Sequence, residues 1–181
     1  MAVAIATKRW TLEELDSMPD DGNKYELVHG QLFVTPAPRQ FHQHVVTMLA
    51  TLLTPYVVVN NLGLVWQARS IIRWRDNEVE PDLFVRAANA DPLSDWNNAP
   101  SPILVVEVLS DSTRRRDLND KRQLYIDEIG IPEYWAVDPD SRHVRVVRRG
   151  LADVVAEHTL TWEPTGATGK LVIDPRTLFA R

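Results

Sequence analysis

A carboxylate inside an apolar stretch is the first feature of this sequence that could do chemistry. Glu107 lies within residues 103–109, which read ILVVEVL and follow Pro100 and Pro102. An almost continuous apolar run of this length is typical of a strand that is covered on both faces. Burying an ionised carboxylate is unfavourable unless a metal ion, a cation or several hydrogen bonds compensate it. Glu107 is therefore a candidate site residue.

A second carboxylate comes from a similar stretch. Residues 79–85 read VEPDLFV and predict a strand, with Glu80 and Asp82 on one face and Pro81 at the strand start or on a sheet edge. Hard cations such as Mg²⁺ take one or two carboxylates together with water and phosphate oxygens. The sequence therefore predicts a site for Mg²⁺ (or Mn²⁺) held by Asp82 and Glu107.

A lysine on the next predicted helix is the third candidate. Residues 118–129 carry apolar side chains at helical spacing and are followed by Gly130, a common residue just past a helix end. Lys121 lies on or beside the apolar stripe, so we expect it to point at the two acids. The alternative is an ordinary surface pair with Asp117, four residues earlier.

Arginines surround these candidates in the sequence. Arg114, Arg115 and Arg116 connect the Glu107 strand to the helix, and three more precede Asp82, namely Arg69, Arg73 and Arg75. If the two strands are neighbours, these side chains would ring the acids and could hold phosphate groups. The alternative for Arg114, Arg115 and Arg116 is an ordinary solvated basic loop. The alternative for Asp82 is an ion pair with Arg86, and the alternative for Glu107 is a buried ion pair with Arg116.

The remaining pattern gives the elements that must position these residues. Residues 11–18 open with a capping box, TLEE, and predict a short helix. Glu26 falls in a predicted hairpin and His42 near the start of a predicted helix. The full set is a hairpin over 24–29 and 31–35, a helix over 39–55, strands over 62–67, 70–74, 133–137 and 143–148, a loop over 87–102, and a strand or two in 151–181. This order predicts an α/β (α+β) fold with a central mixed β-sheet flanked by helices.

Length and composition suit one domain over residues 11–181, after a loose leader at 1–10. The 181 residues are 44% hydrophobic and carry a formal net charge of -5, which argues against an extended nucleic-acid surface. Cysteine is absent, which excludes disulfides and thiolate metal sites. No apolar run approaches the roughly 20 residues that span a bilayer, and we expect a cytoplasmic protein.

With these residues in view, the chain resembles the Uma2 family of endonucleases in the PD-(D/E)XK nuclease superfamily. The similarity runs in order from about residue 11 to residue 148. The matching blocks are YELVHGQL at 25–32, HQ at 42–43, EPD at 80–82, VVEVLS at 105–110, STRR at 112–115, IPEYW at 131–135 and VDP at 137–139, with Asp117, Lys121 and Tyr125 between them.

The resemblance implies a restriction-endonuclease-like fold and Mg²⁺-dependent cleavage of DNA phosphodiester bonds. Asp82 would be the metal-binding aspartate of the superfamily and Glu107 its second acid. The superfamily often has a lysine two residues after that acid, where this chain has Leu109. In chains similar to Uma2, a lysine on the next helix is the suggested replacement, and here that residue is Lys121.

Further expectations follow from the same resemblance. Glu26 is a candidate metal ligand, and the alternative is that it is an outward-facing hairpin residue. His42 is a candidate contact to the scissile phosphate, and the alternative is that it has only a structural role. DNA is the expected partner, a homodimer the expected assembly, and no organic cofactor or membrane is expected. Two other functions stay open. One is a catalytically inactive DNA-binding or scaffold protein, and the other is a glycosidase that uses the two acids without metal.

Overall fold

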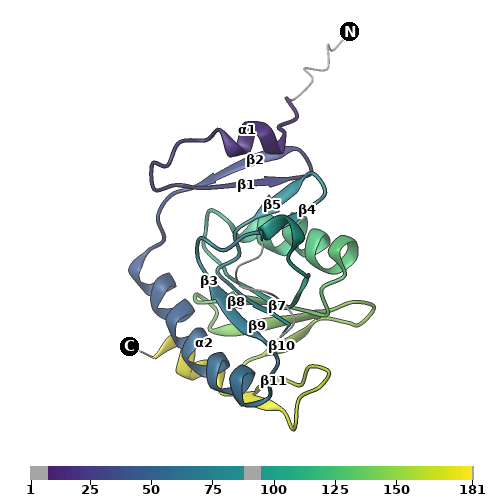
Figure 1. Cartoon of the computed structure of the whole chain (residues 1–181). Helices are drawn as coiled ribbons and strands as arrows, with labels where there is room; N and C mark the ends of the chain where they lie inside the picture. Colours follow the sequence, from purple (N-terminus) through teal and green to yellow (C-terminus); the bar gives the residue numbers. More distant parts are fainter. Residues whose placement is uncertain (1–7, 88–94, 181) are drawn as a thin grey trace.

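A six-stranded sheet forms the centre of the fold (Figure 1). The computed structural model describes residues 8–87 and 95–180. Among the strand pairs of this sheet in the described residues, only β7 and β8 are parallel, so the predicted mixed sheet is confirmed. In spatial order the strands are β10 (Val154–Ala156), β9 (His143–Arg148), β8 (Glu133–Asp138), β7 (Pro102–Val108), β6 (Leu83–Arg86) and β3 (Leu64–Gln67).

A four-stranded sheet lies at one end of the molecule, next to the helix α1 (Figure 1). The predicted hairpin is present, with Val28 opposite Gln31 and a turn at His29 and Gly30 that takes positive φ at both residues. The predicted capping box of Thr11 and Glu14 opens α1. The elements are α1 (Leu12–Asp16), β1 (Lys24–Val28), β2 (Gln31–Thr35), β4 (Ile72–Trp74) and β5 (Asn77–Val79).

The prediction of one strand over residues 79–85 is wrong. β5 ends at Val79 in the four-stranded sheet, and β6 begins at Leu83 in the six-stranded sheet. Pro81 has no N–H to give to a strand partner, so the chain leaves one sheet here and enters the other. The acids of this segment therefore lie at a junction between the two sheets.

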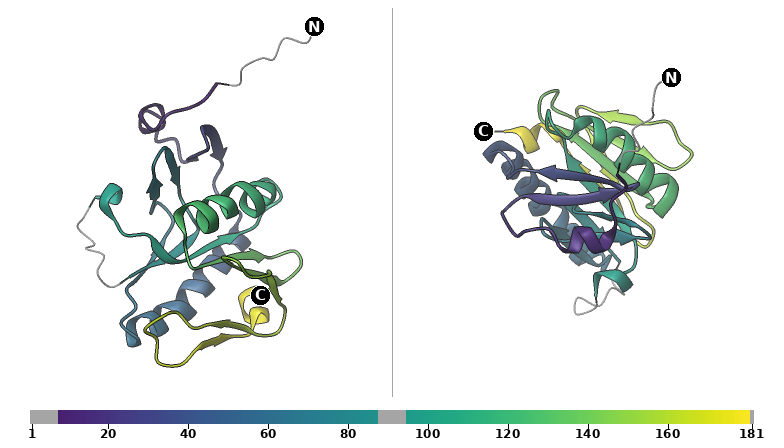
Figure 2. Two further views of the ribbon diagram at one scale, coloured as in Figure 1. Left: turned by 90° about the vertical axis from the view of Figure 1, so that its right-hand side faces the viewer. Right: turned by 90° about the horizontal axis from the view of Figure 1, so that it is seen from above.

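Two helices cover opposite faces of the six-stranded sheet (Figure 2). α2 (Gln40–Val59) packs on one face and runs four residues past Pro55, where the sequence predicted its end. Pro55 is exposed while Val57 is buried, so the burial of the last turn outweighs the missing hydrogen bond. The other helix spans residues 114–129 and ends at Gly130 as predicted, but begins four residues early. It comprises α3 (Arg114–Arg116), η2 (Asp117–Lys121) and η3 (Gln123–Ile129), of which η2 and η3 are wound as π-helix.

The C-terminal part extends the α2 face. The sequence predicted a strand or two after residue 151, whereas the described residues there form three, of which β10 pairs with β9 at the sheet edge. β11 (Leu160–Trp162) and β12 (Leu171–Ile173) form a hairpin, and η4 (Pro175–Phe179) packs against α2. The predicted loop over 87–102 contains the short helix η1 (Trp96–Asn98), and its residues 88–94 lie outside the described residues.

The expected leader is described only in part. Most of it, residues 1–7, lies outside the described residues, and Trp10 is tied to the hairpin turn through a 2.8 Å hydrogen bond from its N–H to the Gly30 carbonyl. Within the described part of the chain, no helix has the length and apolar character needed to cross a membrane.

Candidate active site

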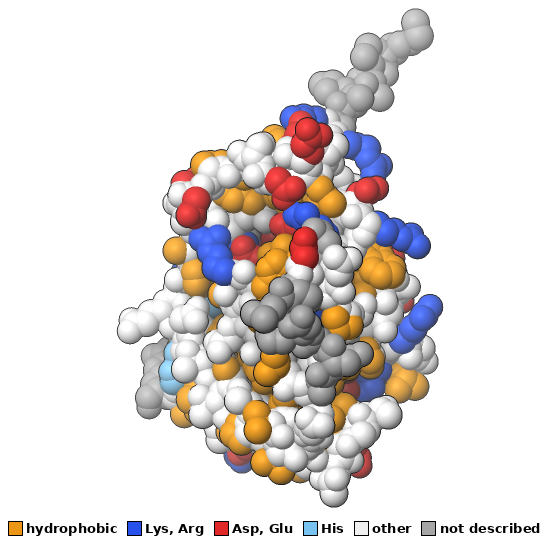
Figure 3. Space-filling view, viewed as in Figure 1, with side chains coloured by type: hydrophobic (Ala, Val, Ile, Leu, Met, Phe, Trp, Pro, Cys, Tyr) orange, Lys and Arg blue, Asp and Glu red, His pale blue; other side chains and the backbone are white. Residues whose placement is uncertain are grey.

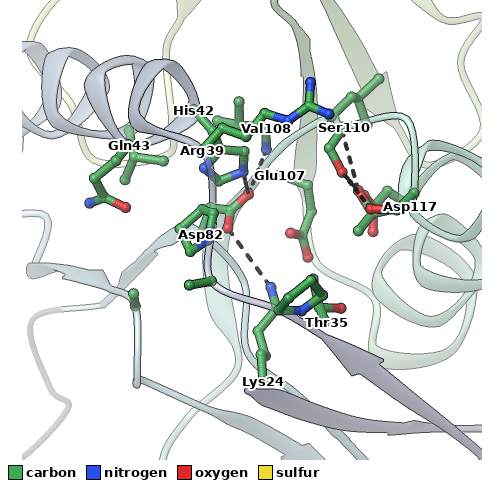
Figure 4. A pocket seen from close by; sticks show the side chains of 18 of the residues that line it. Lys24, Thr35, Arg39, His42, Gln43, Asp82, Glu107, Val108, Ser110 and Asp117 are labelled. Atoms are coloured by element: carbon green, nitrogen blue, oxygen red, sulfur yellow. Dashed lines mark hydrogen bonds and ion pairs between the residues drawn. The ribbon is translucent and has the colours of Figure 1, made fainter. Parts of the chain in front are cut away.

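A cavity of about 500 Å³ lies where the two sheets, the start of α2 and the loop after β7 come together (Figure 4). Both predicted metal ligands, Asp82 and Glu107, line it. Lys24 reaches it from β1, and His42 reaches it from the first turn of α2. The junction between the sheets therefore brings Lys24 and Glu107 to one cavity, although they are 83 positions apart in the sequence.

Asp82 is held from three directions, as the dashed lines in Figure 4 show. Its Oδ2 accepts a hydrogen bond from the Val108 N–H at 2.8 Å and lies 3.2 Å from His42 Nε2, while its Oδ1 lies 3.8 Å from Lys24 Nζ. Burial alone would raise the pKa of Asp82. The hydrogen bond with His42, the charge of Lys24 and the Val108 N–H outweigh burial and lower this pKa to about 2.

Those contacts also affect His42. Burial alone would lower the pKa of its imidazole, but the hydrogen bond and negative charge of Asp82 raise it above the ordinary value. The sequence placed His42 only near a helix start. The structure shows that it lines the cavity and touches the first candidate acid.

Glu107 is almost fully enclosed, with 1% of its surface exposed. Lys121 Nζ donates to its Oε1 at 2.8 Å, and the Tyr125 hydroxyl donates to the same atom at 2.7 Å. Burial raises the pKa of Glu107 to about 7, although Lys121 opposes this shift and nearby Asp117 and Asp82 add to it. Both of these side-chain hydrogen bonds end on Oε1, and Glu107 lines the cavity.

Lys121 is fully buried and joins the two sheets. Its Nζ lies 2.7 Å from Glu26 Oε1 on β1 and 2.8 Å from Glu107 Oε1 on β7. The pair with Asp117 that the sequence left as an alternative is present at 3.7 Å, but it is the longest of the three. Burial would lower the pKa of Lys121, and the charges of Glu107, Glu26 and Asp117 outweigh it and raise this pKa. Of the two acids that Lys121 was expected to reach, it contacts Glu107, whereas its other partners are Glu26 and Asp117; it does not line the cavity.

Glu26 is an inward-facing residue, not the outward-facing hairpin residue of the alternative. Its Oε1 accepts the Glu80 N–H at 2.9 Å, and its Oε2 lies 3.1 Å from Arg116. Burial would raise its pKa, but Lys121, Lys24 and Arg116 outweigh this effect and lower it. The Glu26 carboxylate is therefore paired with positively charged side chains of the protein, and Glu26 does not line the cavity.

These contacts form one ion-pair network, which we define as Lys24, Glu26, His42, Asp82, Glu107, Arg116, Asp117 and Lys121. It contains four carboxylates, three side chains that carry a permanent positive charge, and a histidine. With His42 neutral and its four carboxylates ionised, the network carries one more negative than positive charge. The raised pKa of Glu107 is due first to burial, and the nearby charges of Asp117 and Asp82 add to it. A bound divalent cation would satisfy the same excess.

The donor set fits a hard cation that keeps part of its water shell. No group of three or more His, Cys, Asp and Glu side chains among residues 8–87 and 95–180 is arranged as a complete metal site. Mg²⁺ is usually bound through one or two carboxylates, with water and substrate phosphate completing its shell. Asp82 and Glu107, which line one cavity, match that requirement.

The arginines of the 114–116 run point in different directions. Arg114 forms a two-bond pair with Asp138, at 2.6 and 2.9 Å, and also contacts Asp140. Arg116 is buried against Glu26 and over the ring of Phe33. Arg115 is exposed. The structure therefore leaves Arg115 as the accessible member of the triplet and does not gather all three at the acids.

The remaining arginines that the sequence placed near the acids have different partners. Arg69 lies 3.6 Å from Glu80 at the cavity, whereas Arg73 pairs with Glu78 and Asp16. Arg86 does not pair with Asp82 and instead donates to the Ile71 carbonyl.

Sequence reasoning missed two residues of the site. Lys24, the first residue of β1, carried no signal because a polar residue at a strand start is ordinary. Tyr125 was named among the residues that match the Uma2 family but was given no role in the site, yet its hydroxyl donates to Glu107. A tyrosine four residues after a buried lysine, on the same helix face, is a signal that could have placed it there.

Comparison with known structures places the fold in a class. A crystal structure from Anabaena variabilis, described as "a putative nuclease belonging to DUF820", matches with a TM-score of 0.77 and 20% sequence identity, over 93% of this chain and 97% of that one. This likeness shows a shared fold, and the predicted restriction-endonuclease-like architecture is confirmed. The comparison with curated proteins found no match.

The family follows from the sequence match. Residues 12–174 match the model of the Uma2 family, which is described as "Putative restriction endonuclease". The match covers most of the chain, and the protein belongs to the Uma2 family. The family assignment supports a nuclease function.

Proposed function

We propose that the protein is an endonuclease that hydrolyses DNA phosphodiester bonds and requires Mg²⁺ or Mn²⁺. The observation that carries this proposal is the pair of acids, Asp82 and Glu107, which line one cavity while Lys121 compensates Glu107 from the buried side. Family membership supports the same activity. The arrangement retains two acids that folding alone would not favour.

Asp82 and Glu107, which line the cavity, would hold the cation. When bound, the cation would polarise a phosphate oxygen and lower the pKa of an attacking water. The Val108 N–H and His42 fix the orientation of the Asp82 carboxylate. Lys121 and Tyr125 fix the orientation of Glu107 in the same way. Preorganised ligands of this kind reduce the cost of reaching the productive geometry.

Lys121 takes a positioning role in this proposal. Its amine is enclosed by carboxylates and does not face the cavity, so it acts on the reaction through Glu107. His42 lines the cavity with a raised pKa, which makes it available as a charged contact to a phosphate oxygen. Arg115 and Arg69 are both exposed and can approach the DNA backbone nearby, Arg69 by exchanging its 3.6 Å pair with Glu80 for a phosphate.

The direct test is incubation of the protein with supercoiled plasmid DNA in Mg²⁺, in Mn²⁺ and with a chelator. Conversion of supercoiled plasmid to nicked or linear forms, dependent on the metal, is the expected result. DNA binding without cleavage under all three conditions would instead favour the inactive DNA-binding or scaffold protein. Absence of both binding and cleavage would contradict the proposal altogether.

Metal affinity is expected to depend on pH through Glu107. Because the pKa of this carboxyl is raised to about 7, most Glu107 is protonated at pH 6 and ionised at pH 8. The cation must displace that proton, so Mn²⁺ affinity should be about tenfold weaker at pH 6 than at pH 8. Asp82, with a pKa of about 2, stays ionised throughout.

Isothermal titration calorimetry with Mn²⁺ at the two pH values checks this prediction. The variant Glu107→Gln is the matched control, because it removes the titrating group and should flatten the pH dependence while weakening binding. Equal affinities of the wild-type protein at both pH values would contradict the assignment of Glu107 as a ligand.

A homodimer stays a prediction, based on the frequent pairing of two active sites in double-strand cutters of this fold. We expect size-exclusion chromatography with light scattering to give twice the 20.6 kDa chain mass. A mass equal to one chain over the working concentration range would refute it and would favour nicking of single strands.

A further inference from the structure

The cavity contains a positively charged side chain, Lys24, to which the family comparison gives no role. Lys24 begins β1, lines the cavity, and keeps 20% of its side chain exposed. Figure 4 shows its side chain extending from the hairpin toward Asp82, on the side opposite His42. Lys121, by contrast, has no exposed surface.

The contacts of the Lys24 amine are weak enough to be replaced by a contact to a bound anion. Its amine donates one hydrogen bond, at 3.0 Å, to the Glu80 carbonyl. The distances from Nζ to Asp82 Oδ1 and Glu26 Oε2 are 3.8 and 4.0 Å, beyond hydrogen-bond length. An ammonium group has three N–H donors, so Lys24 can bind an incoming anion without giving up its bond to Glu80.

The contacts of Lys121 are not exchangeable in this way. Its amine lies within 2.8 Å of both Glu26 and Glu107, and a third carboxylate, Asp117, lies 3.7 Å away. Turning this amine toward a phosphate would leave the buried Glu107 carboxylate without a cation paired to it and would remove one of the cations beside Glu26, which is strongly unfavourable.

Arg116 is similarly committed. It is buried, ion-paired with Glu26 at 3.1 Å, and hydrogen-bonded to the Thr35 hydroxyl at 3.3 Å. Of the three permanent cations in the ion-pair network, Lys24 alone combines partial exposure with an amine that reaches the cavity beside Asp82.

We propose that Lys24 is the catalytic cation that contacts the phosphate group at the cleaved bond, and that it does what the missing lysine at Leu109 would do. The inference rests on the proposed nuclease function and deepens it. Lys24 donates an N–H to a non-bridging phosphate oxygen and offsets the negative charge that develops there. Lys121 retains its separate task of positioning Glu107.

Salt dependence of DNA binding separates a phosphate contact from a structural role. Each phosphate contact made by a lysine contributes about 0.9 to the slope of log affinity against log salt on duplex DNA. We expect Lys24→Gln to reduce the magnitude of this slope by about 1 and Lys24→Arg to restore it. The measurement uses a fluorescent duplex and Ca²⁺, with a gel to show that the DNA stays intact.

The variants are chosen so that folding does not decide the outcome. Glutamine can still donate to the Glu80 carbonyl, and Lys24→Met provides a second neutral replacement; circular dichroism and thermal unfolding report on each. Lys170→Met is the matched control, because Lys170 is exposed and outside the cavity lining. In the plasmid assay, Lys24→Gln should lower the nicking rate about 10²-fold, whereas Lys170→Met should leave it unchanged.

The outcomes distinguish the two proposals. A wild-type protein that neither binds nor cleaves DNA overturns the nuclease function and this inference with it. A wild-type protein that binds DNA, with the same salt slope after Lys24→Gln, overturns the role of Lys24 alone. A lower affinity at every salt concentration with an unchanged slope has the same meaning, because a purely structural loss does not alter the number of phosphate contacts.

Discussion

Replacing Glu107 by Gln, or Asp82 by Asn, is expected to lower the metal-dependent nicking rate about 10³-fold, because each change removes one of the two charged ligands that we propose for the cation. Both replacements preserve shape and a hydrogen-bond acceptor. The Glu107→Gln variant still has a carboxylate that compensates Lys121, since Glu26 lies 2.7 Å from the same amine. The plasmid assay under saturating Mg²⁺ measures the effect.

The control for this prediction lies on the helix surface. Asp127 is exposed and outside the cavity lining, and Asp127→Asn removes the same charge from the chain. It should leave the nicking rate unchanged. Thermal unfolding of all three variants shows whether the fold is intact. If folded Asp82→Asn and Glu107→Gln variants cleave as fast as the wild-type protein, these acids are not the metal ligands.

Replacing Lys121 by Met is expected to have the largest effect on stability, a loss of about 4 kcal/mol in the free energy of unfolding near pH 8. The change removes a fully buried cation that lies between Glu26 and Glu107, and Asp117 also loses a partner. Arg116 remains beside Glu26, but no described cation replaces Lys121 beside Glu107. Urea denaturation measures the difference.

The pH dependence of this loss has a defined sign. In the Lys121→Met variant the uncompensated acids have a raised pKa in the folded state, so protonation stabilises that state. The deficit relative to the wild-type protein should therefore shrink as the pH falls from about 8 to about 5. Lys170→Met, at an exposed position, should change stability by less than about 0.5 kcal/mol. A loss below about 1 kcal/mol for Lys121→Met at pH 8 would contradict the buried network.

Local patterns predicted most of the fold. The apolar run around Glu107, the turn at Gly30 and the helix end at Gly130 are short-range signals, and each lies where the sequence placed it. The break at Pro81 was misjudged, because alternation of apolar residues does not show that a chain has moved to a second sheet. That information lies in pairings such as Leu27 with Glu78, which join distant segments.

The candidate site could be predicted because burying a charged side chain is unfavourable for folding. Glu107 and Lys121 stood out because a charge on an apolar strand or helix stripe needs a partner, and they are in fact partners at 2.8 Å. Lys24 and Tyr125 did not stand out, because their positions are ordinary for their residue types. Their roles arise only when β1 and the 114–129 helix meet at the junction. On the surface, Figure 3 shows many acidic and basic side chains at the end of the molecule that carries the four-stranded sheet.

A crystal structure grown with Mn²⁺ tests most directly whether Asp82 and Glu107 share one divalent cation, which is the central claim. We predict an anomalous scattering peak in the cavity, roughly 2.0–2.6 Å from one oxygen of each carboxylate. The claim would be contradicted if the cavity shows no such peak while Mn²⁺ is fully occupied elsewhere on the protein. It would also be contradicted if the cavity shows no such peak and Lys24 and His42 still contact Asp82.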